Sequence, residues 1–367
     1  MSSEPNTVTR DGVVDDTPGE QALTGQAGGQ PPAGRGGGRR KGGRKGGRRD
    51  EHQMVPDATF TSYYGRPILK ASPWERDIPA YLFAGGLAAG SSLLAAGGDL
   101  TGRPVLRRTG RLASIGALSF SMAALVHDLG RPERFLNMLR VAKPTSPMSV
   151  GTWILSTYGA LAGLTVASEL RGLLPRALRC GVPGLLLRLA GRPAGIGAAF
   201  VAPAVAAYTA VLLSDTATPT WHDAHRHLPF VFVGSASAAS GGLAMLAVPL
   251  AEAGPARRLA VGGAVLELAV ERQMERAMGL TAEPLHQGKA GRLMRASKLL
   301  TVAGAAGTAL LAGRSRTGAA LSGAALLAGS ACTRFGVFEA GQASAKDPRY
   351  VVVPQRERLA ARAANGS

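Results

Sequence analysis

Five ionisable side chains crowd into one short stretch, His127–Phe135, which reads His-Asp-Leu-Gly-Arg-Pro-Glu-Arg-Phe. The stretch directly follows a chargeless run, Leu112–Val126, and precedes another, Val150–Ser168. Charge is costly inside a bilayer and persists there beside an internal cavity, a partner or the interface. This pattern predicts a site at the membrane surface, around which the other loops gather.

The chemistry of this site would be proton transfer. His127 titrates near neutral pH, and Asp128 can pair with Arg131, so the three residues could relay protons to a bound redox molecule. The same residues could instead cap a helix end and form an interfacial ion pair, which contributes about 0–1 kcal/mol when exposed. The sequence favours neither interpretation over the other.

Two further groups of polar residues could support chemistry. Three of the six histidines lie between Trp221 and His227, and Asp215 ends an apolar run just before them. This loop could bind a metal, line a quinone or proton path, or serve as a structural loop; the metal is disfavoured because the tract is short and contains no cysteine. Three glutamates at four-residue spacing share one helix face, Glu267, Glu271 and Glu275. They could line a proton route, but a helix that extends into water is the favoured interpretation.

The elements that must position these residues are apolar helices. Four runs hold about twenty residues each without Asp, Glu, Lys or Arg, which is the length of a helix that crosses the hydrocarbon layer. The sequence therefore predicts an all-α, multispanning membrane protein. We expect eight spans, with the sixth the weakest signal, at about 78–98, 109–127, 150–169, 195–214, 229–251, 257–275, 298–313 and 317–334.

Charge and cysteine content restrict the possible partners. The net charge is +18, but the basic residues lie in the tail and beside the apolar runs, which fits lipid headgroups and topology signals better than nucleic acid. The two cysteines, Cys180 and Cys332, form no CxxC pair, so we expect no metal site in this chain. Haem is also not expected, because no two histidines fall where they could face each other inside a bundle.

The chain is expected to have three parts: a tail at 1–58, a transmembrane domain at 59–345 and a C-terminal tail at 346–367. Residues 1–58 are rich in Gly, Pro and Arg and predict disorder. A solvated tail that aids membrane orientation is favoured there over a nucleic-acid or lipid ligand. Basic residues in the loops and flanks number seventeen on the side of the termini against thirteen opposite, which favours cytoplasmic termini.

Four stretches resemble the NrfD/PsrC family, which supplies the quinone-reactive membrane subunit of polysulfide reductase-like complexes. They are Ala80–Ser91 after Trp74, His127–Phe135, Ser146–Trp153, and Tyr208–Asp215 running into the Trp221 loop. The resemblance covers about residues 60–355. It implies two four-helix bundles side by side, no haem or metal, and a plasma-membrane or inner-membrane location.

The resemblance also implies a function. A quinone, such as menaquinone, would bind near the face that docks an iron–sulfur subunit, which connects the chain to a molybdopterin catalytic subunit. Residues carried over from the resemblance are Asp77 and Tyr81 at the entry of the first span, the His127, Asp128 and Arg131 loop, and Asp215. Trp221 and His222 complete the quinone-binding candidates.

The resulting hypothesis is a quinone-linked electron-transfer subunit that has no catalytic cofactor of its own. An alternative is a proton-coupled transporter or ion-translocating bundle without a redox role, in which His127, Asp128, Asp215 and Glu267 form a proton path. A third is a membrane anchor whose basic tail binds nucleic acid or acidic lipid. The electron donor, the direction of electron flow and proton pumping are not specified by the sequence.

Overall fold

The structure, a computed structural model, describes residues 67–131, 133–173, 175–176 and 180–365. These residues form helices joined by short turns, and no strand occurs among them. The predicted all-α fold is therefore confirmed. The predicted tail at 1–58 lies outside the described residues.

Eight helices have 20 or more residues in the described part of the chain. They are α2 (Asp77–Leu100), α3 (Pro104–Asp128), α5 (Pro147–Glu169), α7 (Gly181–Ser214), α9 (Leu228–Ala247), α10 (Gly254–Met278), α11 (Gly288–Leu310) and α12 (Arg316–Lys346). Shorter helices are α4 (Arg134–Met138), α8 (Pro219–Asp223) and α13 (Arg349–Asn365), with 3-10 turns η1 (Arg171–Leu173) and η2 (Gly279–Leu285).

Six of these helices are long and apolar enough to cross a membrane: α2, α3, α5, α7, α9 and α12. Helices α10 and α11 have the length but do not meet the same criterion of length and composition. The chain is a multispanning membrane protein, and the sixth and seventh predicted spans, at 257–275 and 298–313, stay predictions.

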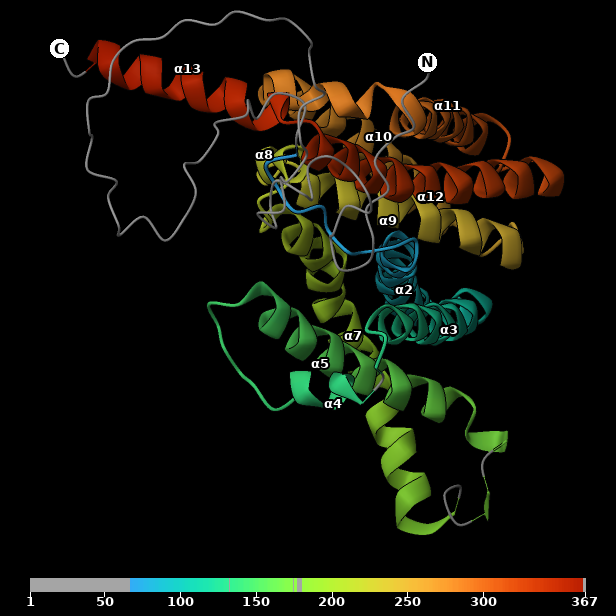
Figure 1. Cartoon of the computed structure of the whole chain (residues 1–367). Coiled ribbons are helices and arrows are strands. Elements are labelled where there is room, and N and C mark those ends of the chain that lie inside the picture. The colour runs from blue at the N-terminus through green and yellow to red at the C-terminus, as the bar shows by residue number, and fades with distance from the viewer. Residues whose placement is uncertain (1–66, 132, 174, 177–179, 366–367) are drawn as a thin grey trace, which may run out of the picture.

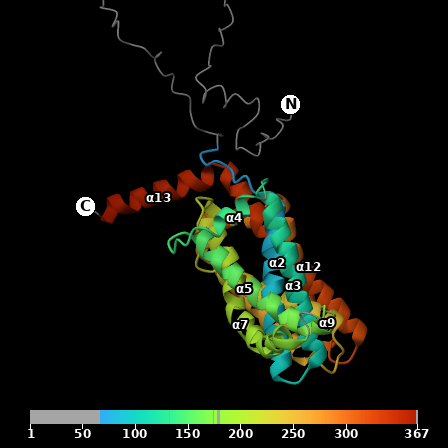
Figure 2. The ribbon, with the colours of Figure 1, turned by 90° about the horizontal axis from the view of Figure 1, so that it is seen from below.

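The long helices form two four-helix bundles side by side (Figure 1). The first bundle consists of α2, α3, α5 and α7, and the second of α9, α10, α11 and α12. Helices α2, α7, α9 and α12 make the contact between the bundles. Helix α13 projects away from both bundles (Figure 2).

Small residues allow the helices to approach closely, because a side chain at these points would meet the neighbouring backbone. In the second bundle, a Cβ atom at Gly242 would lie 2.6 Å from the carbonyl oxygen of Gly323. Between the bundles, a Cβ atom at Gly90 of α2 would lie 2.3 Å from the hydroxyl oxygen of Ser240 of α9. The first contact brings α9 close to α12, and the second brings α2 close to α9.

Successive long helices run in alternating directions, so their connections gather at two ends. One end, which we call the His127 end, holds the segment before α2, the α3–α5 and α7–α9 connections, η2 and the end of α12. Contacts across this end tie it together: Gln342 donates hydrogen bonds to the carbonyls of Ser72 and Trp74, and Trp74 stacks on Trp221 with ring centroids 5.9 Å apart. The 127–135 and 215–228 turns therefore share one end of the bundles.

The opposite end is held by ion pairs and helix caps. Glu169 binds Arg111 at 2.8 Å and Arg107 at 3.2 Å, and Asp99 binds Arg192 at 3.1 Å. Helix α7 begins at Gly181, well before the predicted span at residue 195, so Arg192 lies in this helix and pairs with Asp99 of α2 instead of lying in a loop. Arginine–carboxylate pairs between helices therefore hold the first bundle together at this end.

Two interpretations of charged residues in the second bundle are wrong. Glu267 and Glu271 are each 1% exposed, so the glutamate face does not extend into water. Arg334, counted above as a flanking charge for topology, is 0% exposed, because α12 continues to Lys346 and carries this residue into the interior. The charge of these residues alone predicted that they face water. In the structure, the neighbouring helices enclose them.

Candidate functional site

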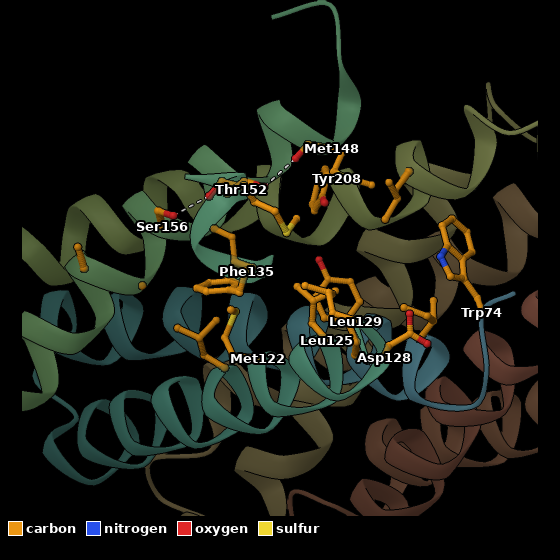
Figure 3. Close-up of a pocket in the computed structure, with 18 residues that line it drawn as sticks. Trp74, Met122, Leu125, Asp128, Leu129, Phe135, Met148, Thr152, Ser156 and Tyr208 are labelled. Atoms are coloured by element: carbon orange, nitrogen blue, oxygen red, sulfur yellow. Dashed lines mark hydrogen bonds between the residues drawn. The ribbon is translucent and has the colours of Figure 1, made fainter. Parts of the chain in front are cut away.

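A pocket of about 440 Å³ opens inside the first bundle, where α2, α3, α4, α5 and α7 meet near the His127 end (Figure 3). Ligand pockets typically span about 300–1,000 Å³ and combine an apolar lining with a few placed polar groups. The lining has this character and consists of Trp74, Ile78, Tyr81, Leu118, Met122, Leu125, Asp128, Leu129, Phe135, Met138, Met148, Thr152, Leu155, Ser156, Gly159, Ala160, Tyr208 and Leu212.

Tyr208 reaches the pocket because α5 has a glycine opposite it. A Cβ atom at Gly151 would lie 1.7 Å from the Tyr208 ring, so any larger residue would displace the phenol. Tyr81 of α2 and Tyr208 of α7 both line the pocket. Helices α2 and α7 thus bring two phenols to one place in an otherwise apolar pocket.

The segment between α3 and α5 covers one side of the pocket. Phe135 and Met138 of α4 and Met148 of α5 enter the lining. The segment is anchored to α5, because Ser149 Oγ donates to the carbonyl of Val141 at 2.8 Å and Trp153 Nε1 donates to the same carbonyl at 3.2 Å. The apolar cover is therefore a fixed part of the first bundle.

Few polar groups in the pocket remain available to a ligand. Thr152 donates to the carbonyl of Met148 at 2.9 Å and Ser156 to that of Thr152 at 2.8 Å, so both hydroxyl protons are used within α5 (Figure 3). Asp128 and Trp74 lie toward one end of the pocket (Figure 3). The other polar side chains in the lining are the two phenols, the Trp74 indole and the Asp128 carboxyl.

Of the residues predicted from sequence, Tyr81 and Asp128 line the pocket. His127 and Asp77 lie just outside it and form a 2.6 Å contact between Nδ1 and Oδ2, with the His127 side chain 82% exposed. Both line a second, polar hollow that shares Trp74 with the pocket. The structure thus puts a solvent-facing histidine–carboxylate pair beside an apolar pocket.

The remaining predicted residues do not line the pocket. Arg131 and Asp215 are exposed, and His222 is exposed with Nδ1 3.2 Å from the carbonyl oxygen of Ser214. Trp221 is fully buried and donates from Nε1 to the carbonyl of Val337 at 2.8 Å. It stacks between Trp74 and Phe338, so it supports a lining residue from behind.

The histidine loop does not gather ligands for a metal. The rings of His222 and His225 are 5.9 Å apart, and no group of three His, Cys, Asp or Glu side chains in the described residues could hold a metal ion. His227 and Ala224 lie in the turn that leads into α9.

Sequence reasoning missed Tyr208 and its relation to Gly151. Tyr208 lies in a run of Ala, Val and Leu residues, and Gly151 lies near the start of another apolar run, so each looked like an ordinary packing residue. An isolated tyrosine in an apolar span facing a glycine in another span was the available signal.

A family model described as polysulphide reductase, NrfD, matches residues 69–279, which is more than half of the chain. The chain belongs to the NrfD family. A comparison with curated proteins gives no match. The NrfD match spans α2 to α10 and contains every residue that lines the pocket, whereas α11 and α12 lie beyond it. NrfD proteins are membrane subunits of polysulfide reductase-like complexes and interact with quinones.

Proposed function

We propose that the pocket in the first bundle binds a quinone and that the chain exchanges electrons between this quinone and an iron–sulfur subunit. The observation that carries the proposal is the combination, in one membrane-embedded pocket, of an apolar lining with two phenols and one carboxyl. A quinone needs an apolar slot for its ring and tail and a few polar groups for its carbonyl oxygens. Membership of the NrfD family supports the same ligand.

The phenols are the proposed partners of a quinone carbonyl. A hydroxyl can donate a hydrogen bond to a carbonyl oxygen of the quinone and accept one from the hydroxyl of the quinol, so Tyr81 and Tyr208 suit both redox states. Trp74, Phe135 and the methionines offer apolar surface to the ring.

Reduction of a quinone to a quinol takes up two electrons and two protons. The proposed route for the protons runs through the Asp128 carboxyl, which lines the pocket, and through the exposed His127–Asp77 pair beside it. Histidine titrates close to neutral pH and suits exchange with water. Arg131 follows α3, is exposed, and stays a proposed member of this route.

Asp215, Trp221 and His222 take other proposed roles. Trp221 is a positioning residue, because it stacks on Trp74 and has no face in the pocket. Asp215 and His222 are exposed at the His127 end and would belong to the surface that meets a partner.

Electrons must come from or go to another protein, and the family indicates which. NrfD subunits usually pair with iron–sulfur and molybdopterin subunits. We propose that the iron–sulfur subunit docks on the His127 end, because this is the end nearest the pocket. We further propose that the chain lies in the plasma or inner membrane and that this end, which carries the first and last described residues, faces the cytoplasm.

Quinone titration of the purified full-length chain in detergent tests the proposal. Tryptophan fluorescence should be quenched by a menaquinone analogue with saturation in the wild type, because Trp74 lines the pocket. Gly151→Ala should weaken this quenching, because the added Cβ atom would displace the Tyr208 ring. Gly163→Ala is the matched control, because a Cβ atom at Gly163 meets nothing within 4 Å. Saturable quenching that is weakened only at Gly151 supports the pocket; unsaturable quenching, or equal quenching in both variants, would refute it.

A further inference from the structure

The interior of the second bundle holds a cluster of charged side chains: Glu267 and Glu271 of α10 and Arg334 of α12. Each is at most 1% exposed. At a rise of about 1.5 Å per residue, Glu267 lies roughly 16 Å from the end of α10. Charge at this depth in a membrane protein is costly and is a reason to look for function.

The cluster is held by hydroxyl groups from three helices. Thr333 Oγ1 donates to Glu267 Oε1 at 2.6 Å and lies 2.6 Å from the Ser297 hydroxyl of α11. On α9, Ser235 donates to Ser330 at 2.8 Å. Helix α9 otherwise presents the Phe232 carbonyl and ring to the cluster.

Arg334 is fixed in place without a close carboxylate partner. Its Nη2 atom donates to the Phe232 carbonyl at 2.8 Å, and its guanidinium stacks 3.6 Å from the centroid of the Phe232 ring. A Cβ atom at Gly86 of α2 would lie 3.2 Å from Nη2, so the guanidinium also rests on α2. Four atoms of the cluster are buried without a hydrogen-bond partner: Nε and Nη1 of Arg334, Oε2 of Glu267 and Oε1 of Glu271.

Ionisable side chains continue from the cluster toward the His127 end. Lys298 Nζ of α11 lies 3.6 Å from Glu271 Oε1 and donates to Glu275 Oε1 at 2.8 Å. Glu275 Oε2 in turn lies 3.9 Å from His286 Nε2. The side chains are 1% exposed at Glu271, 36% at Lys298, 17% at Glu275 and 54% at His286, so the outer members of the series reach solvent. In the other direction, the buried residues of α10 are Ala264, Gly263, Ala260 and Ala256, none of which is ionisable.

The charges of the cluster do not balance. Three carboxylates, Glu267, Glu271 and Glu275, face two permanent cations, Lys298 and Arg334, and His286 adds a positive charge only when it is protonated. An unpaired buried carboxylate is so unfavourable that it binds a proton instead. The one excess negative charge therefore calls for one bound proton. This proton would reside on Glu267 or Glu271, which are the two most buried carboxyls.

We propose that Glu267 and Glu271 form a proton-binding site in the middle of the second bundle, and that this site exchanges its proton with the His127 end through Lys298, Glu275 and His286. The site opens to one end only, because the helix face beyond Glu267 carries no ionisable group. It stores a proton at the bundle centre and does not conduct protons across the chain. The proposal does not depend on quinone binding.

Infrared spectroscopy of the full-length chain in liposomes tests the proposal. At neutral pH the wild type should show the carbonyl stretch of one protonated carboxylic acid in a weakly polar environment, and the band should shift in D₂O because the site exchanges with solvent. Both Glu267→Gln and Glu271→Gln should remove the band, because either change balances the charges. Glu339→Gln should keep it, because Glu339 pairs with Lys289 near the surface of the same end.

Removing a cation should have the opposite effect. Lys298→Met raises the carboxylate surplus from one to two, so the band should grow about twofold. If a glutamine variant does not fold, the wild type labelled with ¹³C-glutamate provides the test, since the band must then shift with the label. Absence of the band from the wild type, its failure to shift in D₂O, or its survival in both glutamine variants would overturn the proposal. The measurement uses no quinone, so its outcome is independent of the proposed electron transfer.

Discussion

The first bundle leaves a pocket between its helices, whereas the second closes its helices around charged side chains. In the first bundle, the polar groups of the pocket are phenols, hydroxyls and one carboxyl near a helix end. In the second, two carboxyls and a guanidinium lie near the middle of long helices. The difference shows how one fold can separate two tasks: the open bundle can accept a lipid-soluble ligand, and the closed bundle can hold charge.

Glycines produce both arrangements. Gly151 faces a large ring, so its missing side chain makes room for Tyr208 in the pocket. Gly242 and Gly323 face each other's backbones, so their missing side chains bring α9 and α12 together. Glycine therefore makes room for a functional side chain in the first bundle and allows close helix packing in the second.

The largest effect should come from removing the buried cation of the second bundle. Arg334→Met leaves Glu267 and Glu271 without their nearest buried positive charge, and loss of one member of a buried charged group costs about 3–5 kcal/mol. Thermal unfolding in detergent should show a large fall in Tm. Arg334→Lys keeps the charge and should lose less; equal Tm values for wild type and Arg334→Met would show that the cluster needs no countercharge.

The next effect concerns the proton route of the first bundle. Asp128→Asn keeps a polar group of the same size but removes the proton carrier, and such groups contribute about 100-fold or more to proton-transfer steps. Quinone-dependent turnover of the assembled complex should fall by about that factor, with membrane insertion unchanged. Asp99→Asn is the control, because Asp99 lies at the opposite end of the first bundle, away from the pocket and from the proposed docking surface, and should retain wild-type turnover. A wild-type rate in Asp128→Asn would leave Asp128 with a structural role alone.

A smaller effect is expected from closing the space that Tyr208 occupies. Gly151→Ala must push the phenol aside and misplace its hydroxyl, which should weaken binding of a menaquinone analogue about tenfold, equivalent to about 1.4 kcal/mol. Gly163→Ala on the same helix should bind like the wild type. Equal affinities in the two variants would contradict the role given to Tyr208.

The smallest effect should follow from removing one hydroxyl. Tyr208→Phe keeps the ring and its packing but loses one hydrogen bond, worth about 0.5–1.5 kcal/mol. Quinone affinity should fall severalfold. The free energy of unfolding should change by no more than about 1 kcal/mol, and Tm accordingly little, because the ring still fills its space. A large drop in Tm with unchanged affinity would assign Tyr208 to the core.

The sequence predicted the architecture well because long apolar runs have few alternatives in a bilayer. It also located the His127 end, since charged turns must lie outside the hydrocarbon layer. Tyr81 and Asp128 were predicted from the family resemblance and line the pocket, but Tyr208 was not, because its role depends on a glycine that is distant in sequence. Glu267 and Arg334 were misplaced for the same reason: their burial depends on which helices surround them, and a charge pattern along one chain segment does not carry that information.

The central claim, that the open first bundle holds the quinone, is tested most directly by photolabelling the full-length chain with an azido-menaquinone analogue and mapping the label by mass spectrometry. The account predicts labels on peptides of α3, α5 and α7, at pocket residues such as Met122 and Met148, and their loss on competition with unmodified menaquinone. Competed label confined to α9–α12 would contradict it.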